Sequence, residues 1–291
     1  MTLTTTVFDR YSGMKTIILF FTVAIVTIEV AGQQLTDGRS FSIGAQYNHE
    51  FLLDGFVQVR EWELPGDKMK LKDLGMKSYP ALQLKVEKRL KRNGNISIVY
   101  DHFFMSGKST FDRNIIYNGT IINGRNGIDV SPTRYFRISA IYSAELFKRP
   151  NFSLLYTAGL VFDHITFYLD GQVDPSSKKD EVLEGFGRQA FPYPVIGLKG
   201  TAGINSKECI QWMISGSYVP KFKSFYIEGG HVYLRYSNFE TGVSYSRAIS
   251  NFDISIGAKL RYMHLFQESN EDTNVISTLT MGPYIGLLYH F

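Results

Sequence analysis

The sequence predicts an all-β protein, a closed, antiparallel, up-and-down transmembrane β-barrel of about ten strands. Three observations lead to this expectation. The chain opens with an apolar leader, later segments alternate strictly between apolar and polar residues, and the connections between those segments alternate between short and long. We expect a signal peptide over residues 1–32 and one barrel domain over residues 33–291.

The N-terminus has the features of a secretory signal peptide. Lys15 precedes an apolar run from Thr16 to Val30, and small residues follow up to Gly32, after which we expect cleavage. The run is shorter than the roughly twenty residues of a spanning helix, which argues against the alternative of an uncleaved anchor. Residues 1–13 show no structural pattern, so we interpret Met14 as the true start.

Composition limits the possible function classes. One cysteine, Cys209, leaves no internal disulfide in an exported chain. The net charge of +4 is spread along the chain, which argues against a nucleic-acid partner. Aromatic residues make up 14% of the sequence, as suits a barrel with an aromatic girdle at each membrane interface. Mean hydropathy is only −0.09, which excludes a helical membrane protein but not a barrel, whose strands face lipid at alternate positions.

Period-two alternation is the main signal for strands. Residues 82–90 read LQLKVEKRL and residues 252–261 read FDISIGAKLR. Because successive side chains leave a strand on opposite faces, each segment has one apolar and one charged face. Most segments exceed the ~9–11 residues that cross a bilayer, whereas strands of the alternative fold, a soluble β-sandwich, are shorter. The expected strands cover 41–63, 79–91, 95–105, 133–147, 151–169, 191–204, 209–221, 229–248, 251–266 and 275–291.

Three local irregularities are expected within these strands. Gly55 should bend the first strand, because glycine in a strand often marks a bend. The alternation loses phase near residues 238–240, which predicts a bulge. Pro283 lacks a backbone donor, which predicts a bulge or an unpaired step in the last strand.

The connections alternate in length along the chain. Outer-membrane barrels have short periplasmic turns and longer extracellular loops, so this alternation predicts the orientation of the barrel. An even number of strands also returns both termini to the periplasm. Short turns are expected at 91–95, 148–151, 205–208 and 248–251, and mostly longer loops at 64–78, 106–132, 170–190, 221–228 and 267–274.

The chain ends with the residues YIGLLYHF. This ending resembles the C-terminal β-signal of bacterial outer-membrane barrels at Tyr284, Gly286, Tyr289 and Phe291, although Tyr284 stands where a polar residue is usual. The resemblance implies a location in the outer membrane of a Gram-negative bacterium, contact with outer-membrane lipid, and recognition of the last strand by the barrel-assembly machinery.

Two internal stretches are similar to a family of uncharacterised ten-stranded outer-membrane barrels. One runs from Leu64 to Gly75 and contains LPG and LKDLG, and the other runs from Thr110 to Gly119 with the sequence TFDRNIIYNG. This resemblance implies fold and location, and it carries no assigned activity.

Charged residues on the polar strand faces are expected to line the lumen, because Arg or Lys facing lipid at the midplane costs about 2–4 kcal/mol. Small barrels are filled by side chains, whereas wide channels need about sixteen strands. We therefore expect a structural or narrow-pore protein with a charged, largely filled lumen, either closed or passing small polar solutes. The expected lining residues are Lys85, Glu87, Arg89, Asp101, Arg137, Glu145, Lys199, Arg235, Asp253, Lys259 and Arg261.

A second function class is surface binding or adhesion through the long loops, which often carry function. The loop at 106–132 is the longest, and its Phe111 and Tyr117 look exposed. The run Lys178–Glu181 is interpreted as a solvated group of charges.

A third class is a hydrolase at the rim of the barrel, like the omptin proteases or the lipid A deacylases. Asp101–His102 and Asp163–His164 are the candidate pairs, but adjacent residues of a strand point to opposite faces. We therefore expect no enzymatic activity and no catalytic, metal or cofactor site. The sequence does not indicate an oligomeric state.

Overall fold

The structure is a computed structural model that describes residues 40–61, 65–90, 94–177, 192–227, 231–269 and 272–291. The chain divides into two units, Met1–Ser40 and Phe41–Phe291, and the second is described below. The expected signal peptide, the start at Met14 and the charge run Lys178–Glu181 lie outside the described residues.

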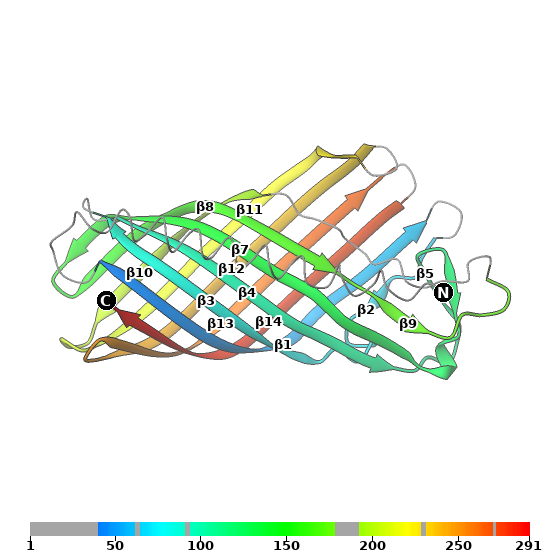
Figure 1. Cartoon of the computed structure of the whole chain (residues 1–291), viewed down its shortest axis with the longest axis horizontal. Helices are drawn as coiled ribbons and strands as arrows, with labels where there is room; N and C mark the ends of the chain where they lie inside the picture. The colour runs from blue at the N-terminus through cyan, green and yellow to red at the C-terminus, as the bar shows by residue number, and fades with distance from the viewer. Residues whose placement is uncertain (1–39, 62–64, 91–93, 178–191, 228–230, 270–271) are drawn as a thin grey trace, which may run out of the picture. The chain divides into compact units, whose positions relative to one another are not determined.

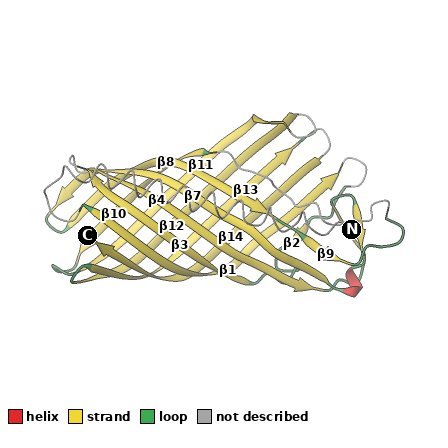
Figure 2. Ribbon diagram, in the orientation of Figure 1, coloured by secondary structure: helices red, strands yellow, loops and turns green. Residues whose placement is uncertain are grey.

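Ten long antiparallel strands form a closed barrel (Figures 1 and 2). Each strand pairs with its neighbours in sequence order, and β14 pairs with β1, so the ring has no free edge. The predicted fold class is therefore confirmed. Within the described residues, no helix is long and apolar enough to span a membrane. The strands are β1 (Phe41–Glu61), β3 (Ser78–Leu90), β4 (Gly94–Ser109), β7 (Ile128–Arg149), β8 (Phe152–Thr166), β10 (Tyr193–Gly203), β11 (Glu208–Ile227), β12 (His231–Ile249), β13 (Phe252–Glu268) and β14 (Asp272–His290).

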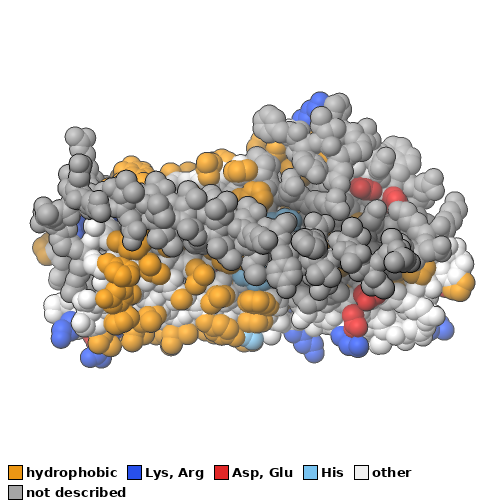
Figure 3. Space-filling view, in the orientation of Figure 1, with side chains coloured by type: hydrophobic (Ala, Val, Ile, Leu, Met, Phe, Trp, Pro, Cys, Tyr) orange, Lys and Arg blue, Asp and Glu red, His pale blue; other side chains and the backbone are white. Residues whose placement is uncertain are grey.

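Alternation places the large apolar side chains of the strands on the outer wall. Ile196 of β10 is 71% exposed and Tyr218 of β11 is 72% exposed, and similar residues project from the other strands. Figure 3 shows these side chains as a hydrophobic band over the wall. A soluble β-sandwich would bury them between two sheets, whereas a barrel in lipid exposes them to acyl chains. This band therefore excludes the sandwich alternative.

Two of the three predicted irregularities are present. The pairing of β1 with β14 shifts register between Leu52 and Asp54, directly beside Gly55. In the ladder with β1, Tyr284 and Met281 of β14 are paired, but the two residues between them have no partner. In the ladder with β13, pairing continues through Pro283. The missing proline donor accounts for this unpaired step.

The bulge predicted near residues 238–240 is wrong. Both ladders of β12 run through Asn238 and Glu240 without a shift, and the two irregularities of the β11–β12 pair lie between Val219 and Phe222 and between Lys223 and Ile227. The apparent loss of phase in the sequence has a simpler cause, because Phe239 faces outward and Asn238 and Glu240 face inward in regular alternation.

Four short strands and one 3₁₀ turn lie at the end of the barrel with the longer connections, which we call the loop end, opposite the turn end with the short turns (Figure 1). The sequence reading treated these segments as loops. β2 pairs with β1, β9 pairs with β7, and β5 and β6 form a separate hairpin. The elements are β2 (Met69–Lys70), β5 (Ile115–Tyr117), β6 (Thr120–Ile122), η1 (Gly124–Asn126) and β9 (Leu169–Gly171).

The β5–β6 hairpin turns at Asn118 and Gly119, both of which have positive φ angles. Asn-Gly is the preferred pair for a two-residue hairpin turn that needs this conformation at both positions. The hairpin is held on one side by residue 67, whose backbone N–H donates to the Ile116 carbonyl at 2.8 Å. On the other side, Asp174 donates its N–H to the Ile121 carbonyl at 2.8 Å. Residues 65–77 and 110–127 therefore form a folded cap.

A continuous apolar cluster, the loop-end core, occupies the loop half of the barrel interior. Among the described side chains, every long strand except β11 contributes an inward-facing member, and β11 packs the half-buried Val219 against it. The cap adds Leu71, Leu74 and Tyr117, each with no exposed surface. The expectation that Tyr117 is exposed is therefore wrong: its ring lies in the core, and its hydroxyl donates to the Phe167 carbonyl at 2.7 Å. Phe111 is half-buried against the same core.

Candidate functional site

Beneath the loop-end core, inward-facing charges form a charged layer. Arg261 of β13 contacts three carboxylates from three different strands: its Nη1 lies 3.1 Å from Glu50, its Nη2 lies 3.5 Å from Asp101, and its Nε lies 3.0 Å from Glu240. The guanidinium also stacks over the Phe103 ring, 5.2 Å from its centroid. Arg261 thereby ties β1, β4 and β12 together across the barrel.

Arg137 of β7 forms the second centre of the charged layer. Its Nε donates to Asp163 at 2.8 Å, and its Nη1 lies 3.5 Å from Glu240, which therefore bridges the two arginines. The buried Asp163 also accepts hydrogen bonds from the hydroxyls of Tyr193 and Tyr236. These donors satisfy a carboxylate that is only 1% exposed.

Lys259 completes the layer, with its Nζ 3.8 Å from Glu240 and 5.0 Å from the Tyr284 ring centroid. Four carboxylates thus face three cations in one cross-section. Removing one partner from a buried ion pair costs about 3–5 kcal/mol, because the remaining charge stays buried without compensation. The ion pairs of the layer therefore cross-link the strands next to the loop-end core. Its members are Glu50, Asp101, Arg137, Asp163, Glu240, Lys259 and Arg261.

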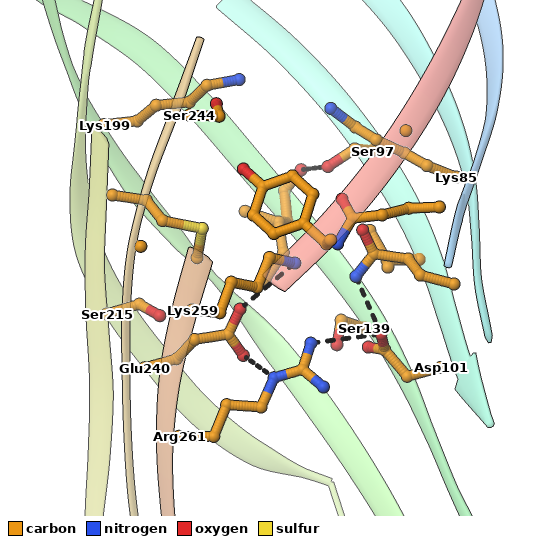
Figure 4. Close-up of a pocket in the computed structure, with 18 of the residues that line it drawn as sticks. Lys85, Ser97, Asp101, Ser139, Lys199, Ser215, Glu240, Ser244, Lys259 and Arg261 are labelled. Atoms are coloured by element: carbon orange, nitrogen blue, oxygen red, sulfur yellow. Dashed lines mark hydrogen bonds and ion pairs between the residues drawn. The ribbon is translucent and has the colours of Figure 1, made fainter. Parts of the chain in front are cut away.

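A cavity of about 460 Å³ is lined by members of the charged layer and of the loop-end core and extends to the turn end (Figure 4). Its lining reaches Asn95, Asp253 and His290, each within two residues of a strand end at the turn end. Lys85 of β3 and Lys199 of β10 are the cations of this half. Seven serines also line the cavity. These serines, which come from five strands and line the cavity beside several Gln, Asn and Thr side chains, are Ser97, Ser139, Ser143, Ser215, Ser244, Ser246 and Ser255.

Most of the expected lining residues face this cavity or the layer above it. The structure brings together Lys85, Glu87, Asp101, Arg137, Lys199, Asp253, Lys259 and Arg261.

Three expected lining residues lie elsewhere. Arg89 is exposed and Glu145 pairs with Lys148 at 3.5 Å, both near the turn end beyond the cavity. Arg235 is on the outer wall, with its guanidinium 5.1 Å from the centroid of the Phe266 ring. The predicted lumenal position of Arg235 is therefore wrong: the ladders of β12 run without a shift from Arg235 to Phe239, so both residues have the outward phase.

Three members of the charged layer, Glu50, Asp163 and Glu240, are not among the lining residues expected from sequence. Glu50 follows Gln46 and Asn48 at a spacing of two, so the alternation that identified the other charges was also available here. Its burial depends on contact with Arg261, which is 211 residues away in the chain. No local pattern in the sequence indicates that contact.

In each of the two Asp–His pairs, the barrel wall separates the carboxylate from the imidazole. Asp101 and Asp163 belong to the charged layer, whereas His102 bonds the Tyr100 hydroxyl at 2.9 Å and His164 bonds the Thr166 hydroxyl at 3.1 Å on the outer face. Neither carboxylate can therefore orient its neighbouring imidazole. Within the described part of the chain, no three His, Cys, Asp or Glu residues are grouped as metal ligands would be.

The residues of the C-terminal ending divide between the two faces of β14. Tyr284 and Gly286 line the cavity. Tyr289 packs on Phe252 and Phe291, with ring centroids 4.8 and 4.7 Å apart.

Comparison with known proteins is informative only at the level of structure. No protein-family model matches the chain, and no curated protein matches it in sequence. The outer membrane protease OmpT from Escherichia coli superimposes with a TM-score of 0.51 at 13% identity, covering 89% of this chain and 99% of that one. The translocator domain of the autotransporter NalP from Neisseria meningitidis has a TM-score of 0.40 at 10% identity, covering 97% and 99% of the two chains. The chain therefore has the architecture of the outer-membrane β-barrels.

Proposed function

We propose that the protein is a non-conducting outer-membrane barrel, with its interior closed in the loop half and a polar cavity facing the turn end. The observation that carries this proposal is the stacking of the charged layer directly beneath the loop-end core. A solute crossing the barrel would have to separate Arg261 and Arg137 from their carboxylates and then pass through close-packed apolar side chains. Barrels of this size are filled by side chains rather than open, which supports the closed reading over a narrow pore.

The proposal includes a location and a route. The hydrophobic band supports residence in the outer membrane of a Gram-negative bacterium, in contact with its lipid. Residues 1–32 would act as a cleaved signal peptide, and the strand that ends at Phe291 would be recognised by the barrel-assembly machinery. Mass spectrometry of the protein from purified outer membranes tests the cleavage, with Gln33 expected as the first residue.

Planar-bilayer recording tests the closed barrel. Refolded protein that runs as a compact species on unheated gels is inserted into the bilayer, and insertion is verified by protease protection. We expect no discrete conductance steps, because both the charged layer and the loop-end core must be crossed. Reproducible steps from verified protein would contradict the proposal and support the narrow pore.

A matched pair of variants sharpens this test. Arg261→Ser combined with Arg137→Ser removes both guanidinium groups of the charged layer, whereas Arg89→Ser combined with Arg149→Ser removes the same charge at the turn end. If the barrel is closed, the variant with Arg89→Ser and Arg149→Ser should show no conductance. Any new conductance should appear only in the variant with Arg261→Ser and Arg137→Ser.

Surface binding through the cap is a second candidate function, favoured by the folded state of the cap. Arg113 makes a two-pronged ion pair with Asp67, at 3.0 and 3.2 Å, and leaves Asp112 and Arg125 exposed around it. Pre-ordered loops lose little entropy on binding. Deletion of residues 112–126 should abolish binding of host or bacterial cells without loss of barrel assembly, and unchanged binding would remove this candidate.

We propose no catalytic role. The support is the separation of each Asp–His pair by the barrel wall. The likeness to OmpT concerns the fold alone at 13% identity. Incubation with peptides or lipid A followed by mass spectrometry tests this, and a specific product that depends on the folded barrel would contradict it.

A further inference from the structure

Two lysines face one another in the turn half of the cavity. Lys85 projects from β3 and Lys199 from β10, and three strands, β4, β7 and β8, separate them along the shorter path around the wall. Figure 4 shows their ammonium groups pointing towards each other across the cavity. Like charges in such an arrangement repel, so the fold places them together at an energetic cost.

The carboxylates nearby do not balance this pair. Lys85 forms an ion pair with Glu87 on its own strand. Among the described residues, no carboxylate lies within ion-pair distance of Lys199, on which the strongest electrostatic influence is the repulsion from Lys85, only partly opposed by Glu87. The remaining acid of this half, Asp253, bonds His290 at 2.8 Å. Two ammonium groups therefore share one carboxylate.

Serine hydroxyls of the lining can donate hydrogen bonds without adding negative charge. Ser97 and Ser244 line the same cavity as the two lysines (Figure 4). Hydroxyl groups donate readily to oxyanion oxygens. The volume of about 460 Å³ also falls within the range of pockets that hold small organic ligands.

We propose that this cavity binds a small phosphate-bearing anion between Lys85 and Lys199, with entry from the turn end. Lysine contacts phosphate as a point charge, and bonds between ammonium and phosphate are charge-assisted. The anion supplies the negative charge that the protein lacks at this position. The serine hydroxyls that line the cavity fit either free phosphate or the phosphate ester of a hydroxylated molecule. This site does not depend on the barrel being closed.

Isothermal titration of the folded protein in a non-ionic detergent tests the site. Inorganic phosphate, glucose 6-phosphate and neutral glucose are titrated separately at low ionic strength, since salt screens the lysines. We expect at least one phosphate compound to bind and glucose not to bind. Equal affinities for the two phosphate compounds would indicate free phosphate as the ligand, and tighter binding of glucose 6-phosphate would indicate a phosphate ester.

Variants separate the site from general charge effects. Lys199→Gln should weaken phosphate binding by about tenfold or more, as expected for loss of one charge-assisted bond, and Lys85→Gln should do the same. Lys207→Gln, at an exposed turn at the same end of the barrel, should bind as the wild type does. Compact migration on unheated gels establishes that each variant is folded.

The proposal is overturned if the folded wild type binds neither phosphate compound, if glucose binds as tightly as glucose 6-phosphate, or if Lys199→Gln and Lys207→Gln have equal affinities. Failure here differs from failure of the closed barrel. If the wild type conducts but binds phosphate, and Lys199→Gln weakens that binding, the site is supported. Only the proposal that the barrel does not conduct is then refuted.

Discussion

The two halves of the barrel interior are built from strands of the same ring, yet they are filled differently. In the loop half, Leu265 of β13 is 3% exposed and belongs to a core with members from nearly every strand. In the turn half, Ser255 of the same strand lines an open cavity. The charged layer lies at the boundary. The comparison indicates that the closed half supplies rigidity, whereas the open half leaves room for a ligand.

The largest expected effect on stability comes from disrupting the charged layer. Arg261→Met leaves Glu50, Asp101 and Glu240 without their shared partner and should lower the free energy of unfolding by about 3–5 kcal/mol. Urea titration of the barrel in phospholipid vesicles measures this. Arg89→Met, at the exposed turn end, is the control and should change it by less than about 0.5 kcal/mol. Equal effects on the free energy of unfolding would mean that the ion pairs of the charged layer do not stabilise the barrel.

The next effect compares one strand in the two halves. Leu265→Ala removes a buried side chain from the loop-end core and should cost about 2–5 kcal/mol. Ser255→Ala, ten residues earlier on the same inward face, should be within about 0.5 kcal/mol of the wild type because its hydroxyl faces the cavity. The same urea titration compares them. A large loss for Ser255→Ala would show that the turn half is as tightly packed as the loop half.

A smaller effect concerns the cap that covers the loop-end core. Gly119 has a φ of +70°, and a Cβ there would overlap the Glu61 carboxylate. Gly119→Ala should strain the β5–β6 turn by about 1–3 kcal/mol and expose the cap to protease on intact cells. Gly203→Ala at the turn end serves as the control, because the closest heavy atom to the added Cβ would be 3.8 Å away, an ordinary contact. Unchanged protease resistance of Gly119→Ala would argue that the hairpin does not hold the cap closed.

The smallest expected effect is a pH dependence of the cap. Hydrogen bonds from the hydroxyl and N–H of Ser176, and from the Asn114 amide, lower the pKa of Asp174 below its ordinary value of 3.8. Because the folded pKa is depressed, this stabilisation is present above pH 3.8 and is lost as the pH falls through the folded pKa. Protease protection of the cap should therefore weaken slightly at acid pH. Asp174→Asn should remove that part of the pH dependence, and an identical profile would show that Asp174 does not contribute.

Much of the wall could be predicted from sequence, and the interior of the loop half could not. The ten long strands were expected within a few residues of their observed bounds, because alternation is a local property that each strand displays by itself. The same alternation identified the cavity lysines Lys85 and Lys199. It failed for Arg235, which has the outward phase of Phe239 in ladders that run without a shift.

The cap shows the limit of such reasoning most clearly. Residues 65–77 and 110–127 read as surface loops because they are polar, glycine-rich and outside the alternating segments. Their apolar members, Leu71, Leu74 and Tyr117, are buried because the loop end of the barrel offers them an apolar interior. Asn118-Gly119 was the one local signal of a hairpin in this region.

By itself, the sequence determined the class of the fold, the phase of nearly every strand and the identity of most inward-facing charges. These follow from the period of two, which requires no knowledge of distant residues. Only the tertiary structure decided that Arg261 meets Glu50, that the cap covers an apolar core, and that Lys85 and Lys199 face one another across a cavity. Each of these depends on closure of the ring, which brings together residues far apart in the chain, and local alternation carries no information about such contacts.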